Sequence, residues 1–151
     1  MISFAPLQPD AIALLQAETG ISFADEAFLE PKWFCCTARS RYGEIDGILV
    51  GEFTSWFDVN ITSVIVNPRF MSRRLLRAIF TALFSSAVRV TAYAEPENEK
   101  SIKALEQLGF VREGFCRFII DGRRDGFVYG MVVPECKWLR QPQQVFEEAA
   151  Q

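Results

Sequence analysis

Histidine does not occur in this chain of 151 residues, and its absence excludes several kinds of chemistry. Without an imidazole there is no Ser-His or Cys-His nucleophilic pair and no usual zinc catalytic set. The chain also has no side chain whose ordinary pKa lies near neutrality. Any acid–base step must therefore use carboxylates, tyrosine, serine or water.

Cysteine is scarce, and its spacing does not suggest a metal site. The four cysteines are Cys35, Cys36, Cys116 and Cys136, and no two of them form a C-x-x-C pair. An adjacent pair inside an expected strand fits buried thiols better than a disulfide framework or a zinc site. We therefore expect structural thiols and no bound metal.

The sequence also lacks a long apolar run and an excess of charge of one sign. No apolar stretch approaches the ~20 residues that a membrane span needs. Residues 1–6 have neither the basic segment nor the apolar segment of a secretion signal. Sixteen basic and nineteen acidic residues give a net charge of −3, which favours neither nucleic acid nor an anionic membrane as a partner. We expect a soluble, cytoplasmic protein.

Half of the residues are apolar, which at this length allows one core that buries about 70% of the unfolded surface. We expect one domain over residues 1–133 and a polar, partly disordered tail over residues 134–151. Helical patterns occupy residues 9–17, 24–29, 70–84 and 98–108, and strand patterns occupy residues 33–39, 45–53, 59–66, 88–93, 110–120 and 126–133.

The order of these patterns predicts a mixed sheet. Three strands joined by short links predict an antiparallel meander, and the last two strands predict a hairpin. Strands 59–66 and 88–93 are separated by a helix, so we expect them to be parallel neighbours. Ligands of such sheets bind at the carboxyl ends of the strands, here near Val66 and Tyr93.

The most informative stretch begins at Asn98 and ends at Phe110. Asn98 is a good N-cap because its side-chain oxygen can accept a hydrogen bond from an early backbone N–H. Gly109 is suited to the left-handed position that ends a helix. Asn98, Ser101, Leu108, Gly109 and Phe110 have the spacing Asn-x-x-Ser followed by Leu-Gly-Phe, which resembles the late segment of the GNAT acyl-CoA N-acyltransferases.

The resemblance implies the GNAT fold, an α/β (α+β) domain. Its mixed central sheet has antiparallel strands, one parallel splayed pair and about four flanking helices. Glu113, Gly114 and Arg117 look most similar to the branch of ribosomal-protein N-terminal acetyltransferases. The implied reaction moves an acetyl group from acetyl-CoA, a small-molecule thioester, to a primary amine of a small molecule, a protein N-terminus or a lysine. The resemblance leaves a homodimer open, and the sequence does not define the acceptor.

One part of the family pattern is degenerate. In relatives, an Arg/Gln-x-x-Gly-x-Gly/Ala loop at a helix start holds the pyrophosphate of coenzyme A with its backbone N–H groups. The corresponding residues here are 71–76, and both glycines are replaced. Four arginines lie nearby, where positive charge opposes the helix dipole by ~0.3–1 kcal/mol per group unless an anion is close. We expect phosphate ligands among Arg69, Ser72, Arg73, Arg74 and Arg77, with a solvated basic face as the alternative.

Candidates for proton transfer follow from the same resemblance. Many relatives carry a tyrosine acid at the position of Leu105, so we expect Ser101 to donate the proton to the leaving thiolate, directly or through water. The alternative is that the Ser101 hydroxyl only satisfies the backbone. Tyr93 and Glu95 are the other catalytic candidates, with Glu52 and Asp58 as further possible bases.

The resemblance also places backbone groups of Val64, Ile65 and Val66, and the amide of Asn98, against the cofactor. The alternative function is a GNAT-like binding or assembly protein, as in phage-encoded relatives, that has lost turnover. The replaced glycines and the missing tyrosine favour this alternative. The retained Asn98 and Ser101 favour the acetyltransferase, which is our preferred hypothesis.

Overall fold

The computed structural model describes residues 1–23 and 27–139. Its strands are β1 (Ile2–Ser3), β2 (Trp33–Arg39), β3 (Ile45–Phe53), β4 (Asp58–Ile65), β5 (Arg89–Ala94), β6 (Val111–Ile120) and β7 (Arg124–Val132). Its helices are α1 (Pro9–Thr19), α2 (Arg73–Phe84) and α3 (Glu99–Leu108), and its 3-10 turns are η1 (Ala27–Leu29), η2 (Pro68–Met71) and η3 (Val133–Glu135).

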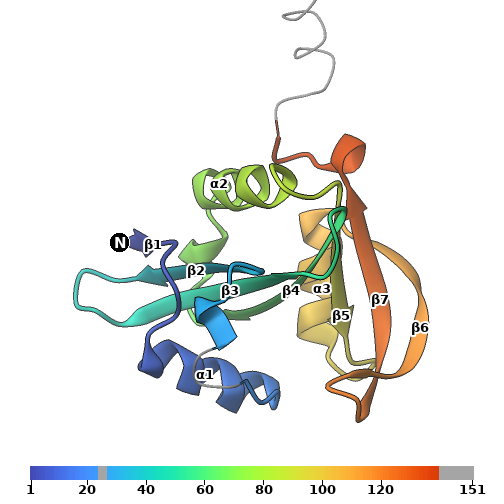
Figure 1. Cartoon of the computed structure of the whole chain (residues 1–151), viewed down its shortest axis with the longest axis horizontal. Helices are drawn as coiled ribbons and strands as arrows, with labels where there is room; N and C mark the ends of the chain where they lie inside the picture. The colour runs from blue at the N-terminus through green and yellow to red at the C-terminus, as the bar shows by residue number, and fades with distance from the viewer. Residues whose placement is uncertain (24–26, 140–151) are drawn as a thin grey trace, which may run out of the picture.

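The strands form one mixed sheet in the order β1-β2-β3-β4-β5-β7-β6. The meander β2-β3-β4 and the hairpin β6-β7 are antiparallel, and β4 and β5 are parallel. The predicted mixed sheet, with its parallel pair, is therefore confirmed. Figure 1 shows α1 below the sheet and α2 above it, with α3 behind β5.

The helix count of about four was too high, since the described residues contain three α-helices. Of the pattern at residues 24–29, residues 24–26 lie outside the described part, and Ala27–Leu29 form a single 3-10 turn. Phe28 anchors this turn, with its ring centroid 4.9 Å from that of Trp33. Pro31 follows two residues after the turn, and the residue before a proline is disfavoured in helical conformation.

The helix predicted over residues 70–84 begins at Arg73 instead. Asn67 accepts a hydrogen bond from the Arg69 N–H at 3.1 Å and so starts the separate turn η2. Ser72 then adopts an extended backbone, with ψ at 145°, and caps α2 by accepting from the Leu75 N–H at 3.3 Å. Two local capping side chains therefore divide what the hydrophobic period alone predicted as one helix.

The position of the Phe70 side chain requires a glycine on the strand beneath it. Its side chain is 2% exposed, and a Cβ added to Gly47 of β3 would lie 2.3 Å from its ring. Because no side chain fits in that space, Gly47 lets the Phe70 ring lie directly on the sheet. This contact holds η2, and with it the start of α2, against β3.

Two clusters of buried side chains lie on opposite faces of the sheet. The larger one joins α2 to β4, β5 and β7, and the partly buried Ile102, Leu105 and Leu108 of α3 pack against it. The smaller one joins α1 and η1 to β2 and β3. No helix in the described part of the chain is long and apolar enough to cross a membrane.

Part of the expected tail packs on the domain. Cys136 is buried, and the indole N–H of Trp138 donates to the carbonyl oxygen of Leu108 at 2.9 Å. Residues 140–151 lie outside the described part of the chain. All four cysteines are free, three of them buried, and burial raises the pKa of the Cys36 thiol to about 12. The prediction of buried thiols is confirmed for Cys35, Cys36 and Cys136.

Candidate functional site

The parallel strands β4 and β5 separate before either of them ends. Their pairing runs from Asp58 and Arg89 to Ile61 and Ala92, while β4 continues to Ile65 and β5 to Ala94. Beyond this point β4 pairs only with β3, and β5 only with β7. Two strand edges with unpaired backbone groups therefore diverge at the carboxyl ends, which is where a ligand of such a sheet is expected.

The backbone positions predicted to contact a cofactor lie on or just beyond one of these edges. Val64 and Ile65 belong to the part of β4 that has no partner on the β5 side. Val66 follows the strand, and its N–H donates to the carbonyl oxygen of Asp46 at 2.9 Å. Because successive residues of a strand bond to opposite sides, the backbone groups of Ile65 point to the open edge, whereas those of Val64 and the Val66 N–H are turned toward β3.

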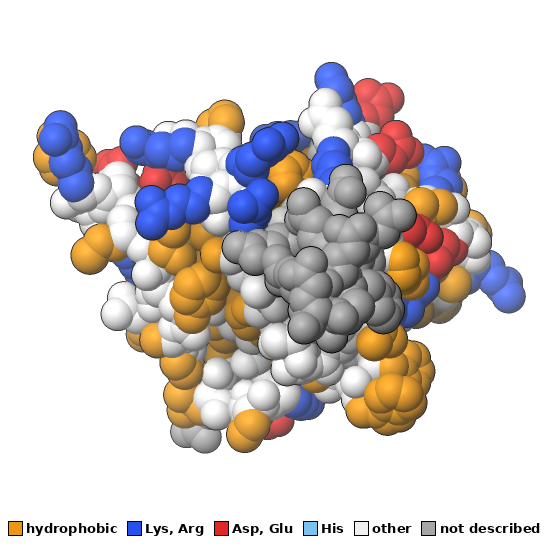
Figure 2. All heavy atoms as spheres, turned by 90° about the horizontal axis from the view of Figure 1, so that it is seen from above, with side chains coloured by type: hydrophobic (Ala, Val, Ile, Leu, Met, Phe, Trp, Pro, Cys, Tyr) orange, Lys and Arg blue, Asp and Glu red, His pale blue; other side chains and the backbone are white. Residues whose placement is uncertain are grey.

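The basic residues at the start of α2 fall into two groups. Arg69 pairs with Asp46, with its Nε 3.2 Å from Oδ2. Arg73, Arg74 and Arg77 are exposed, and no carboxylate of the described residues lies within ion-pair distance of them. Figure 2 shows Lys and Arg side chains spread across the upper half of the face that carries α2. Three of the four predicted arginines are therefore free to meet an anion.

Helical spacing gives the positions of these arginines around α2. Arg73 and Arg77 share a side with Phe80 because they precede it by seven and three residues. The Phe80 ring packs against Phe110, which follows α3, with 6.2 Å between centroids. Arg73 and Arg77 thus lie on the side of α2 that faces α3, and Arg74 is turned around the helix axis by about 100° from Arg73 and about 60° from Arg77.

The start of α2 leaves backbone N–H groups open. The backbone N–H groups of Arg73 and Arg74 donate to no acceptor among the described residues. The neighbouring Phe70 N–H donates to the carbonyl oxygen of Asn67, and the Ser72 N–H donates to that of Arg69 in η2. Two helix-start N–H groups, aligned with the positive end of the dipole, therefore remain where relatives have a glycine loop.

Asn98 caps α3 as the sequence predicts, and Ser101 lies in the first turn of this helix. Asn98 Oδ1 accepts a hydrogen bond from the Ser101 N–H at 3.1 Å and caps α3. The Ser101 hydroxyl is half-buried and makes no hydrogen bond to the described residues. It is therefore not used by the backbone, and its proton is free for another acceptor. Leu105 packs on the core, so no acid stands at the position of the relatives' tyrosine.

Solved structures with similar folds include two N-acetyltransferases. The ribosomal-protein-S5-alanine acetyltransferase from Vibrio fischeri matches at a TM-score of 0.61 and 16% identity, over 91% of this chain and 93% of that one. A variant of the spermidine N-acetyltransferase SpeG from Vibrio cholerae matches at a TM-score of 0.67 and 14% identity, over 88% of this chain and 94% of that one. The chain has the GNAT fold. No protein-family model and no curated protein matches the sequence.

Tyr93 lies on the face of this GNAT sheet opposite α2. Strand alternation places it there, because Val90, Ala92 and Ala94 belong to the core under α2. Burial raises the pKa of Tyr93, and the Asp58 carboxylate raises it further. The phenol is therefore neutral at ordinary pH, so it suits a proton donor better than a base.

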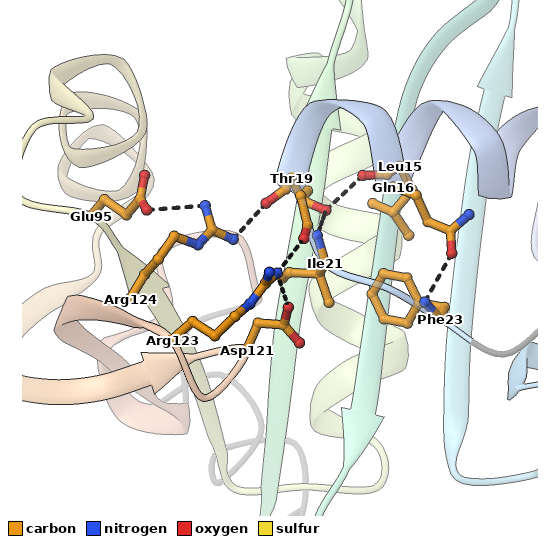
Figure 3. Close-up of polar contacts among 10 residues, drawn as sticks. Leu15, Gln16, Thr19, Ile21, Phe23, Glu95, Asp121, Arg123 and Arg124 are labelled. Atoms are coloured by element: carbon orange, nitrogen blue, oxygen red, sulfur yellow. Dashed lines mark hydrogen bonds and ion pairs between the residues drawn. The ribbon is translucent and has the colours of Figure 1, made fainter.

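Glu95 is held by an ion pair that the sequence did not indicate. The Arg124 Nη1 lies 3.0 Å from its Oε1, and the same guanidinium donates from Nη2 to the Thr19 carbonyl oxygen at 2.7 Å. Arg123 donates to the Gly20 carbonyl oxygen at 3.0 Å. Figure 3 shows these side chains reaching from the β6-β7 turn to the end of α1. Glu95 thus has part of a structural role, and only its Oε2 has no partner among the described residues.

Asp58 is engaged in a second network on the same face. The Thr91 hydroxyl donates to its Oδ1 at 2.8 Å, and the Arg89 Nε donates to the Thr91 Oγ1 at 3.0 Å. Arg89 also forms a two-pronged ion pair with Glu113 across Gly130. A Cβ on Gly130 would lie 2.5 Å from the Glu113 carboxylate, so the glycine makes room for the pair. Sequence reasoning missed this network because its members are 24 and 33 residues apart.

The Arg89–Glu113 pair predicts a pH dependence of stability. Hydrogen bonding to Arg89 lowers the pKa of Glu113 below its ordinary value of 4.5. A carboxylate whose folded pKa is depressed stabilises the fold above its unfolded pKa, and this contribution is lost as the pH falls through the folded value. Glu113→Gln should therefore lose stability at pH 7 but converge with the parent in acid. Urea unfolding at pH 7 and pH 3 measures this, and a constant difference would contradict it.

Proposed function

We propose that the chain is an N-acetyltransferase that moves an acetyl group from acetyl-CoA to a primary amine. The observation that carries this proposal is the separation of β4 and β5 beyond Ile61 and Ala92. A pantetheine arm is an extended chain with amide groups, so it can pair with an open strand edge as a peptide strand does. The open edge at Ile65 supplies the backbone groups for this pairing.

The charged end of the cofactor would meet the start of α2. The free N–H groups of Arg73 and Arg74 and the guanidinium of Arg77 offer hydrogen bonds and positive charge there. In this proposal side chains replace part of the missing glycine loop. Asn98 contributes only its amide nitrogen, because its oxygen caps α3.

The reaction needs two proton movements and an exchange of bonds at the thioester carbon. A neutral amine attacks this carbon, the new C–N bond forms, and the C–S bond breaks as the carbonyl returns. The amine gives up a proton to a base or to water, and the thiolate takes one from a donor. Ser101 is the first candidate donor because its hydroxyl is unused, and Tyr93 is the second because its phenol stays protonated.

A binding protein without turnover is the second candidate function. It is favoured by η2, whose hydrogen bonds satisfy N–H groups that a glycine loop would leave open, and by the pairing of Glu95 and Asp58 with other side chains. Such a protein would bind coenzyme A without transferring the acetyl group to any amine. Activity across a broad amine panel separates it from the enzyme.

A charge reversal on α2 tests the cofactor site. Arg73→Glu combined with Arg77→Glu should weaken coenzyme A binding by at least about tenfold, as expected when charge-assisted hydrogen bonds are lost. The loss should be larger at low salt, because salt screens exposed charges. Isothermal titration calorimetry measures the affinity. In the parent, coenzyme A at 100 times its Kd should add about 2.7 kcal/mol of stability.

Arg117→Glu is the matched control for this experiment. Arg117 is an exposed arginine of β6 that makes no ion pair within the described residues. Its replacement by glutamate changes the net charge by as much as each of the two replacements on α2 does. If the control weakens coenzyme A binding as much per charge, only a long-range field is involved. If the double variant binds as the parent does, the arginines form a solvated face.

A further inference from the structure

A concave pocket of about 580 Å³ lies on the side of α2 that faces away from α3. It is formed by β1, the β2-β3 turn, η2 and the first turn of α2, and Leu75 lines it. Pockets of about 300–1,000 Å³ are the size that small molecules and cofactors occupy. This space is separate from the diverging edges of β4 and β5, since β2 and β3 lie on the other side of β4.

The β2-β3 turn presents two exposed side chains at the rim of this pocket. Arg41 and Tyr42 both line it, and the Arg41 guanidinium lies 5.0 Å from the centre of the Tyr42 ring. The Tyr42 ring is 78% exposed, and Arg41 has no carboxylate within ion-pair distance among the described residues. An open aromatic face and an uncompensated guanidinium therefore stand next to each other.

Hydrogen bonds hold this turn in one conformation. The Ser40 N–H donates to the Glu44 carbonyl oxygen at 2.8 Å, and the Ser40 Oγ accepts from the Tyr42 N–H at 3.2 Å. Arg39 donates to the Gly43 carbonyl oxygen at 3.0 Å while it is paired with Asp10. Arg41 and Tyr42 are thus carried by a pre-organised turn, which lowers the entropy cost of binding a ligand.

The polar groups of the pocket are mostly donors. The hydroxyl oxygens of Ser40 and Ser72 accept backbone hydrogen bonds, and neither O–H donates to a described residue. The one carboxylate in the lining, that of Asp46, is paired with Arg69. Two unused hydroxyl protons and the free guanidinium of Arg41 therefore call for an acceptor-rich, negatively charged ligand.

We propose that this pocket binds a nucleoside phosphate. Its phosphate is held by Arg41, Arg69 and the hydroxyl of Ser72, and its base stacks on the exposed face of Tyr42. The shared chemistry is a phosphate ester joined to a planar ring, and it has two possible sources. One is a free nucleotide, and the other is the nucleotide end of coenzyme A reaching around the start of α2. The proposal does not depend on acetyl transfer.

Calorimetric titration with adenosine 5′-monophosphate tests the proposal. The parent should bind it more tightly than either adenosine or inorganic phosphate, because only the nucleotide reaches both the charged and the aromatic part. Arg41→Ala should raise its Kd at least about tenfold, the loss expected for a charge-assisted hydrogen bond. Tyr42→Ala should weaken the nucleotide and leave the affinity for phosphate unchanged. Both side chains are exposed, so neither change removes core packing.

Arg117→Ala controls for the loss of one positive charge elsewhere and should bind the nucleotide as the parent does. A repeat with saturating coenzyme A distinguishes the two sources. Undiminished nucleotide binding identifies a free nucleotide as the ligand, whereas competition, together with weaker coenzyme A binding by Arg41→Ala, identifies the cofactor's own nucleotide. No binding at millimolar concentration, or equal Kd values for parent and Arg41→Ala, would overturn the proposal.

Discussion

Replacing Ser101 with alanine should lower kcat by ~10²–10⁴, the contribution of a positioned acid, and leave the affinity for coenzyme A nearly unchanged. The physical reason is the unused hydroxyl of Ser101, whose own N–H is already capped by Asn98. Because the cap remains in the variant, stability should change little. Steady-state rates with acetyl-CoA and a panel of primary amines measure the effect, with acetyl-CoA hydrolysis as the acceptor-free control.

Tyr93→Phe is the matched variant for this test. It removes the other candidate proton donor and keeps the aromatic ring that is packed on the opposite face of the sheet. If Ser101→Ala retains full turnover while Tyr93→Phe loses it, the phenol is the acid and the Ser101 hypothesis is wrong. If Ser101→Ala loses stability and keeps turnover, the hydroxyl has only a structural role. If the parent binds coenzyme A but shows no activity across the panel, the chain is a binding protein.

The elements that sequence predicted well are those whose signals are local. Asn98 caps the start of α3 through its side chain, and Gly109 ends the helix in a left-handed conformation, with φ at 106°, as predicted. The bounds of β2 and β3 agree with the prediction to the residue, because their apolar runs end at turn residues. The GNAT fold could be anticipated for the same reason, since its motif lies within a single helix and the glycine that ends it.

The interactions that sequence did not predict join residues far apart in the chain. Arg124 meets Thr19 across 105 positions, and Arg89 meets Glu113 across 24. A charged residue in a turn or a strand has many possible partners, and only the folded sheet selects one. Glu95 and Asp58, both considered as bases, are engaged in this way. Residue type alone therefore suggested more available carboxylate bases than the folded protein offers.

The start of α2 shows how a local signal can be outweighed. The apolar period beginning at Phe70 predicted a helix there, but the caps of Asn67 and Ser72 divide the segment. Phe70 is buried in a contact with Gly47 of a distant strand, and a pattern of apolar residues cannot reveal that pairing. A glycine within an otherwise apolar strand is the available signal, because it often marks a close approach of another group.

Gly47→Ala should destabilise the protein by about 3 kcal/mol, the upper part of the range for an overpacked core. The added Cβ would lie 2.3 Å from the Phe70 ring, so this buried ring, which is 2% exposed, would have to shift from its packed position. At about 2–4 °C per kcal/mol for a chain of this length, Tm should fall by roughly 6–12 °C. Thermal unfolding followed by circular dichroism measures the change.

Gly114→Ala is the matched control, because a Cβ at this glycine meets nothing within 4 Å. It should change stability by less than about 0.5 kcal/mol, as an unobstructed surface substitution does. Phe70→Ala alone should cost about 3–5 kcal/mol through the cavity it leaves. When Gly47→Ala and Phe70→Ala are combined, the methyl group added to β3 occupies part of that cavity and meets no ring. The combined loss should therefore be smaller than the sum of the two single losses. Strictly additive losses would mean that Gly47 and Phe70 do not touch in the folded protein, since only side chains in contact produce such a coupling energy.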